Sequence, residues 1–203
     1  MARIDFFQAA EGMAASAALA RLEGALAQDE PGVESGIPAA SRESFRGRRW
    51  VTRPRPHVDR LACAWLIRRF LDPDAGIRYA DAPEPGEVSF DMRRTDFGHV
   101  GNRCSFETML EAFGLKEPGL AALAEIVHEI DLRDGRFVRP EIAGVDSILA
   151  GWSTLSLPDP EIERLGFHLF EGLYGTLSIS REAHADEPGP ERPSRRGRTR
   201  KPK

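Results

Sequence analysis

Histidine and carboxylate side chains occur in two stretches of the chain at spacings that suit metal coordination. Glu125, His128 and Asp131 stand three residues apart in a segment with helical periodicity, so they share one face of the expected helix. Upstream, His99 lies in a loop bracketed by glycines, and Glu107 falls in the first turn of another expected helix. Two imidazoles and two carboxylates form a ligand set that Fe, Mn, Zn or Ni accepts. The predicted divalent-metal ligands are therefore His99, Glu107, His128 and Asp131.

Each of these residues also has an ordinary structural interpretation. Glu125, a supporting candidate, can form a solvated ion pair with His128 on the helix face, and His99 can be a turn residue. Glu107 can be an acid at a helix start, where the helix dipole favours it. Cys104 is either a further thiolate ligand or a small buried apolar residue. The spacing alone leaves both interpretations open.

Arginine side chains before and within another expected helix form a candidate anion site. Arg60 and Arg68 lie two turns apart on one helix face, and Arg53 precedes them. A guanidinium group presents a planar fork of donors that grips a tetrahedral oxyanion, and N–H groups at a helix start would help. Asp59 would cap this helix or pair with an arginine, and Arg60 would lower the pKa of the Cys63 thiol one turn away. A salt-bridged surface helix explains the same spacing.

The elements that must position these side chains follow from apolar periodicity and from Pro and Gly punctuation. We expect short strands at 50–52, 77–80 and 88–92 and helices at 58–71, 105–113, 118–134, 142–152 and 160–174. Ser105 is the expected N-cap of its helix, and Pro118 is expected at the first position of the next. The sequence therefore predicts a predominantly helical α+β domain with a few short strands.

The chain divides into three parts by composition. In residues 1–45 we expect an amphipathic helix at 5–27 followed by a linker. Residues 46–180 are expected to form a single folded domain, and residues 181–203 a disordered basic tail. With 41% hydrophobic and 30% charged residues in 203, the chain has enough apolar residues for one globular core. The apolar stripe of the first helix would pack on its own domain or on a second copy in a homodimer.

Several classes of protein are disfavoured. No apolar run is long enough to cross a membrane, and the N-terminus does not resemble a cleavable signal. The net charge of −4 argues against direct nucleic-acid binding by this chain alone, and two cysteines are too few for a disulfide framework. We therefore expect a cytoplasmic protein. Phosphate-loop, Rossmann, nucleophile-elbow and zinc-protease motifs do not occur.

Five blocks in the same order resemble the C-terminal domain of the ChrB family of chromate-resistance proteins. The resemblance covers about residues 48–175 and rests on Trp50–Pro54, Val58–Asp72, Phe97–Glu107, Ile126–Asp131 and Leu169–Tyr174. Residues 5–27 are similar to the end of that family's N-terminal region, which is associated with DNA-linked regulation. The resemblance implies a link to chromate resistance, and the blocks contain many of the polar residues singled out above.

Three hypotheses follow. The domain binds a metal, a chromate-like oxyanion or both, in a stress-sensing or regulatory role. Alternatively, it is a metal-dependent oxidoreductase acting on chromate or reactive oxygen, which would require Fe or Mn for one-electron cycling. In the third hypothesis, the polar blocks are buried salt-bridge networks without chemistry.

Overall fold

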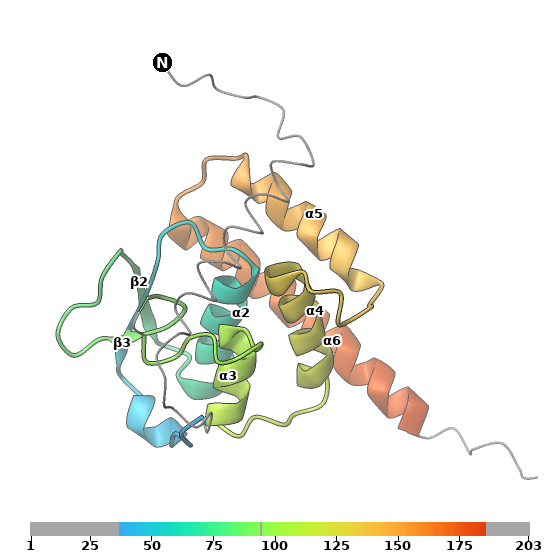
Figure 1. Cartoon of the computed structure of the whole chain (residues 1–203), viewed down its shortest axis with the longest axis horizontal. Coiled ribbons are helices and arrows are strands. Elements are labelled where there is room, and N and C mark those ends of the chain that lie inside the picture. Colours follow the sequence, from blue (N-terminus) through green and yellow to red (C-terminus); the bar gives the residue numbers. More distant parts are fainter. Residues whose placement is uncertain (1–36, 94, 186–203) are drawn as a thin grey trace, which may run out of the picture.

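A computed structural model describes residues 37–93 and 95–185 and confirms a mostly helical α+β domain (Figure 1). Three parallel strands form a small sheet in the order β2-β1-β3. The strands are β1 (Arg49–Thr52), β2 (Gly76–Tyr79) and β3 (Val88–Ser89). The helices are η1 (Arg42–Phe45), α2 (Val58–Leu66), η2 (Ile67–Leu71), α3 (Ser105–Ala112), α4 (Leu120–Leu132), α5 (Glu141–Ser153) and α6 (Asp159–Ala185).

Helix α2 is the centre of the domain and packs against α3, α4 and α6 (Figure 1). Every one of its side chains is buried except Arg60, which explains why its sequence is almost wholly apolar. Trp65 contacts the rings of Phe106 on α3 and Phe170 on α6. The chain continues from α2 into the π-helical turn η2, so the predicted helix at 58–71 is one continuous helical segment with two geometries.

The parallel sheet brings the ends of β1 and β3 to one edge. Trp50 and Val51 of β1 are paired with Val88 and Ser89 of β3, and α2 follows β1 directly in the chain. Strand β2 lies on one side of β1 and β3 on the other, so the order of strands reverses at β1. In open parallel sheets, the crevice outside the carboxyl ends at such a reversal is where ligands bind, which makes this edge a position of interest by analogy.

The folded part of the chain extends further at both ends than the sequence predicts. Ile37, Ala40 and Phe45 pack on the core within the segment interpreted as a linker. The last helix, expected at 160–174, runs to Ala185, so the expected disordered tail begins inside α6. The predicted helix at 5–27 and residues 186–203 lie outside the described residues.

One predicted N-cap and one predicted helix start differ from the structure by one or two residues. Cys104 rather than Ser105 is the N-cap of α3. Helix α4 begins at Leu120 after Gly119, whose φ of +85° suits glycine. A Cβ at Gly119 would lie 2.6 Å from the Ser178 hydroxyl on α6, so a close approach of two helices also requires this glycine. In the described ranges, no helix is long and apolar enough to cross a membrane.

Candidate metal centre

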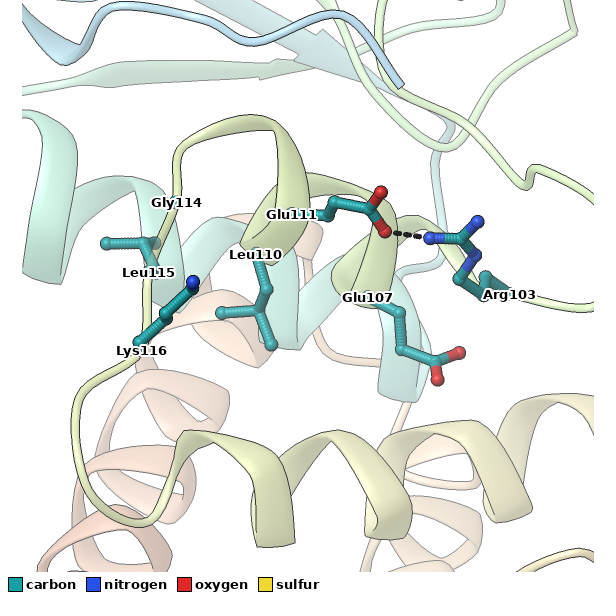
Figure 2. A pocket seen from close by; sticks show the side chains of 7 residues that line it. All are labelled: Arg103, Glu107, Leu110, Glu111, Gly114, Leu115 and Lys116. Carbon is teal, nitrogen blue, oxygen red and sulfur yellow. Dashed lines mark hydrogen bonds and ion pairs between the residues drawn. The ribbon is translucent and has the colours of Figure 1, made fainter. Parts of the chain in front are cut away.

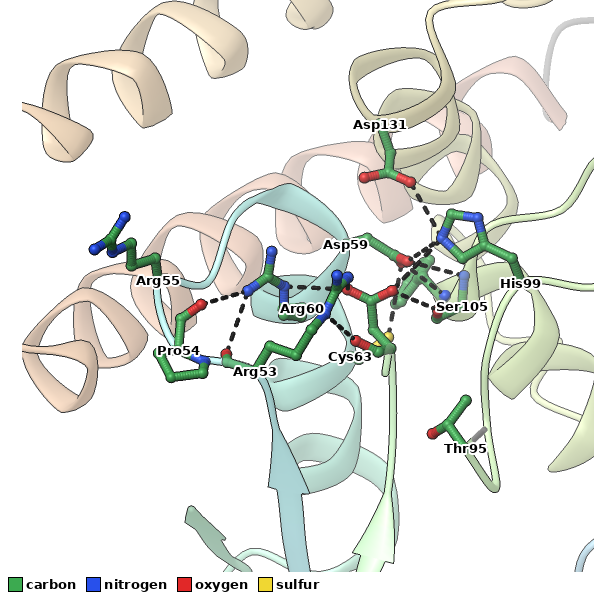
Figure 3. A network of polar contacts seen from close by, with 12 residues as sticks. Arg53, Pro54, Arg55, Asp59, Arg60, Cys63, Thr95, His99, Ser105 and Asp131 are labelled. Carbon is green, nitrogen blue, oxygen red and sulfur yellow. Dashed lines mark hydrogen bonds and ion pairs between the residues drawn. The ribbon is translucent and has the colours of Figure 1, made fainter. Parts of the chain in front are cut away.

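Three aspartates surround the imidazole of His99 at the carboxyl edge of the sheet (Figure 3). The Nε2 atom of His99 lies 3.2 Å from Asp59 Oδ2, 3.3 Å from Asp131 Oδ2 and 3.6 Å from Asp91 Oδ1. We call these four residues the aspartate–histidine cluster. Ligand atoms of Asp59, Asp91 and His99 all lie within 4.8 Å of one another, close enough to share one ion.

Four separate segments supply the cluster. Asp59 comes from the first turn of α2, Asp91 directly follows Ser89 and Phe90 at the end of β3, His99 lies in the loop before α3, and Asp131 lies in the last turn of α4. The parallel pairing of β1 with β3 therefore places Asp91 beside the start of α2.

Asp59 also holds the start of α3. Its Oδ2 accepts the Ser105 N–H at 2.9 Å and its Oδ1 accepts the Phe106 N–H at 2.8 Å. The Asp59 side chain is only 2% exposed, and these two bonds satisfy N–H groups that a helix start leaves without an intrahelical partner. The sequence suggested Asp59 as a cap of its own helix, but the structure makes it the cap of a different one.

The charges of the cluster shift each other's pKa values. Burial raises the pKa of Asp131 to about 7, and the nearby carboxylates of Asp59 and Asp91 add to this shift. Burial would lower the pKa of His99, but the three surrounding aspartates outweigh it and raise that pKa to about 9. Burial also opposes ionisation of Asp59, whose pKa is nevertheless lowered by the hydrogen bonds it accepts. Within the cluster, three carboxyl groups therefore face a single imidazole.

Arginine side chains flank the cluster on one side (Figure 3). Asp91 Oδ2 lies 3.1 Å from Arg60 Nε and 3.3 Å from an Arg53 guanidinium nitrogen. Arg60 also donates to the carbonyl oxygens of Arg53 and Pro54, which fixes its position against the chain that leaves β1. Two of the three predicted anion-binding arginines thus lie together beside the aspartates.

Arg68, the third predicted anion ligand, lies elsewhere. Its guanidinium contacts Glu163 of α6 at 2.8 Å, and the Tyr79 hydroxyl donates to the other oxygen of Glu163 at 2.8 Å. Glu163 is 9% exposed, so this is a mostly buried ion pair that joins η2 and β2 to α6. The i, i+8 spacing of Arg60 and Arg68 does not bring their charged groups to one site, because Arg60 pairs with Asp91 whereas Arg68, in the π-helical turn η2, pairs with Glu163.

Glu107 and His128, the other two predicted metal ligands, form a second group with Asp134. His128 Nδ1 lies 2.7 Å from Glu107 Oε2, and His128 Nε2 lies 3.2 Å from Asp134 Oδ2. The His128 side chain is fully buried and packs edge-on against the Phe137 ring. We call Glu107, His128 and Asp134 the His128 cluster. Each imidazole nitrogen contacts a carboxylate oxygen, so this histidine bridges two segments of the chain.

Glu107 ties the His128 cluster to the start of α3, because its Oε2 also accepts the Cys104 N–H at 2.9 Å. Glu107 lies at one side of a shallow groove along α3 that Leu110, Leu115 and the ion-paired Arg103 and Glu111 also line (Figure 2). The structure thus divides the four predicted ligands into two pairs, His99 with Asp131 and Glu107 with His128.

The supporting candidates have separate roles. Glu125 forms an ion pair with Arg139 at 2.9 Å, away from His128. Burial raises the pKa of the Cys63 thiol well above its ordinary value, and nearby aspartates add to the shift, so the prediction of a lowered pKa is wrong. Burial likewise raises the pKa of Cys104. Both thiols are buried and free, and neither has the electropositive surroundings of a reactive cysteine.

Sequence reasoning missed Asp91 and Asp134. Asp91 follows the third expected strand, and a carboxylate after a strand is a usable signal only once parallel pairing is known. Asp134 lies six residues after His128, beyond the end of α4, where helical spacing no longer predicts proximity.

Residues 50–177 match the family model described as ChrB, C-terminal domain. The chain belongs to the ChrB C-terminal domain family. It is 38% identical over 164 residues to Protein ChrB of Cupriavidus metallidurans, covering 77% of this chain and 49% of that protein. The chain thus spans about half the length of this curated ChrB relative. No solved structure matches the chain.

Proposed function

We propose that this ChrB C-terminal domain binds one divalent cation at the aspartate–histidine cluster and acts in chromate resistance as a sensing or regulatory domain. The observation that carries the proposal is the position of His99 Nε2, within 3.6 Å of three separate carboxylates. The side chains of His99 and Asp131 are 36% and 24% exposed, so a cation has a route from solvent. Asp59 and Asp91 would form the buried floor of the site.

Carboxylate oxygens dominate this ligand set, which favours some cations over others. Three carboxylates and one imidazole suit Mn²⁺ and Fe²⁺, whereas thiolate and multi-imidazole sites suit Zn²⁺. The Asp59 carboxylate accepts two backbone N–H groups, and a carboxylate has about four acceptor positions. A shared cation would take the position on Oδ2 that now faces His99 Nε2. We therefore expect Mn²⁺ or Fe²⁺ as the physiological ion.

The proposed regulatory role follows from what Asp59 touches. A cation that draws on the Asp59 carboxylate also acts on the start of α3, because the same oxygens accept the Ser105 and Phe106 N–H groups. The relative positions of α2, α3 and α4 would then change together when a cation binds the aspartate–histidine cluster. The link to chromate comes from the ChrB family, and Arg53 and Arg60 beside the cluster supply positive charge for that dianion.

A structural role is the second candidate function, and one observation favours it. Asp59 is buried and caps α3 through both of its oxygens, as expected of a charge network that only holds helices together. Such a network would bind no cation stoichiometrically.

Elemental analysis and titration distinguish the two functions. Wild-type protein is purified untagged, analysed for bound metal, stripped with chelator and titrated with Mn²⁺, Fe²⁺, Zn²⁺ and Ni²⁺. We expect about one ion per chain, with Mn²⁺ affinity lowered at least tenfold in Asp131→Asn. Asp146→Asn is the matched control, since Asp146 is a partly exposed carboxylate paired with Arg133. Equal affinity in both variants, or no binding by the wild type, would overturn the proposal.

A further inference from the structure

Asp91 is shared between the aspartate–histidine cluster and a groove of arginines. One of its oxygens, Oδ1, faces His99 and accepts the Ser105 hydroxyl at 3.2 Å. The other, Oδ2, faces Arg60 and Arg53. A single carboxylate thus takes part in both a candidate cation site and the neutralisation of two guanidinium groups.

The far side of these guanidinium groups is an open hollow of about 520 Å³. We call it the arginine groove, and its lining residues are Arg53, Pro54, Arg55, Arg60 and Asp81. Arg53 is 47% exposed at its side chain, whereas Arg60 is 17% exposed. The groove is therefore open to solvent at one arginine and deep at the other.

Arg55 is the arginine of this groove that the sequence did not single out. Its φ of +56° is unusual for a residue with a side chain, and its N–H donates to the Asp159 carboxylate at 3.0 Å, which holds that conformation. Within the described part of the chain, the Arg55 guanidinium forms no ion pair with a carboxylate. The groove thus contains one guanidinium group with no ion pair among the described residues, next to two arginines whose ion pairs are both with Asp91.

We propose that a divalent cation at the aspartate–histidine cluster and a small dianionic oxyanion in the arginine groove bind cooperatively, with Asp91 as the group that couples them. The inference rests on the proposed function. When Asp91 coordinates a cation, its charge is shared with that ion, so Arg53 and Arg60 lose part of their neutralising partner. An oxyanion bound between the three guanidinium groups then supplies the negative charge that Arg53 and Arg60 receive from Asp91 when no cation is bound.

Thermodynamic linkage gives this proposal a reciprocal test. If the cation tightens oxyanion binding by some factor, the oxyanion must tighten cation binding by the same factor. Sulfate is the probe, because it is a tetrahedral dianion without redox chemistry. Mn²⁺ affinity of the full chain is measured by electron paramagnetic resonance, which reports free Mn²⁺, in sulfate and in chloride at equal ionic strength. We expect Mn²⁺ to bind at least about fivefold more tightly in sulfate.

Two variants make the experiment specific to the groove. Arg55→Gln should reduce the sulfate effect to less than about twofold while Mn²⁺ affinity in chloride stays unchanged, because Arg55 does not contact the cluster. Arg49→Gln is the matched control: Arg49 is an exposed arginine at the opposite end of β1, and its variant should retain the full effect. Mn²⁺ binding that is equal in sulfate and chloride would overturn the cooperativity alone, whereas no Mn²⁺ binding in chloride would overturn the proposed function as well.

Discussion

His128 and Asp131 lie one turn apart on α4, yet they belong to two clusters with opposite properties. In the His128 cluster, one fully buried imidazole lies between two carboxylates, each of which also accepts a backbone N–H. In the aspartate–histidine cluster, one partly exposed imidazole faces three carboxylates through a single nitrogen. The same residue types therefore make a closed structural bridge in one place and a partly exposed group of three carboxylates around one nitrogen in the other. Saturation with partners and access to solvent distinguish them, whereas residue type does not.

Removal of the buried imidazole should give the largest change in stability. His128→Leu leaves Glu107 and Asp134 without their shared partner, and we expect the free energy of unfolding to fall by about 3 kcal/mol. Urea denaturation measures this loss. The exposed His168 provides the control, since His168→Leu should change stability by less than about 0.5 kcal/mol. A His128→Leu protein of wild-type stability that no longer binds a cation would reverse the roles of the two clusters.

Two aspartates of one cluster should respond to neutralisation with opposite signs. In metal-free protein, Asp59→Asn weakens the cap of α3 and should cost about 1–2 kcal/mol of unfolding free energy. Asp131→Asn removes a charge that lies against Asp59 and Asp91, and should leave stability unchanged or raise it by up to about 1 kcal/mol. Both variants should bind Mn²⁺ more weakly. Paired denaturation curves in chelator check the signs, and equal losses in both variants would contradict this account.

The stability of metal-free protein should depend on pH through Asp131. Since the pKa of Asp131 is raised to about 7, the folded chain holds this proton more tightly than the unfolded chain between pH ~4 and ~7. The contribution of Asp131 to the free energy of unfolding is therefore fully present at pH ~4, and it declines as the pH rises to ~7. Wild-type protein should therefore lose stability relative to Asp131→Asn from pH ~4 to ~7. Melting temperatures across this range test the difference, which a pH-independent offset would refute.

His99 should extend the decline to higher pH. Its pKa is raised to about 9, so its contribution is complete below pH ~6.5 and is lost as pH rises through about 9. In chelator, the melting temperatures of wild-type protein and His99→Gln should therefore converge as the pH rises from ~6.5 to ~9. A gap that widens with pH would contradict the assigned charges.

The smallest effect is expected at Glu125, which shares its helix face with His128 in the sequence but pairs with Arg139 in the structure. Glu125→Gln should change stability by less than about 0.5 kcal/mol, because the pair is partly exposed. Its Mn²⁺ affinity should equal that of wild type. A tenfold loss of affinity, measured by the same titration, would place the cation at the His128 side of α4.

Local signals predicted most of the elements and only part of the site. The helices at 105–113 and 142–152 were placed within about one residue, because apolar periodicity and flanking Gly and Pro mark them. The end of α6 was missed because small polar residues such as Ser178 weaken the pattern, although Ser178 packs against Gly119. The grouping of His99 with Asp91 depends on parallel pairing of β1 with β3, which no local pattern encodes. Residue types identified His99 and Asp131, but only tertiary structure separated them from Glu107 and His128.

The most direct test compares the two histidines as single variants. His99→Gln and His128→Gln are purified in the same way, shown to be folded, stripped of metal and titrated with Mn²⁺. The account predicts about one ion per chain with near wild-type affinity for His128→Gln, and at least a tenfold loss for His99→Gln. Retention of affinity in His99→Gln together with its loss in folded His128→Gln would contradict it.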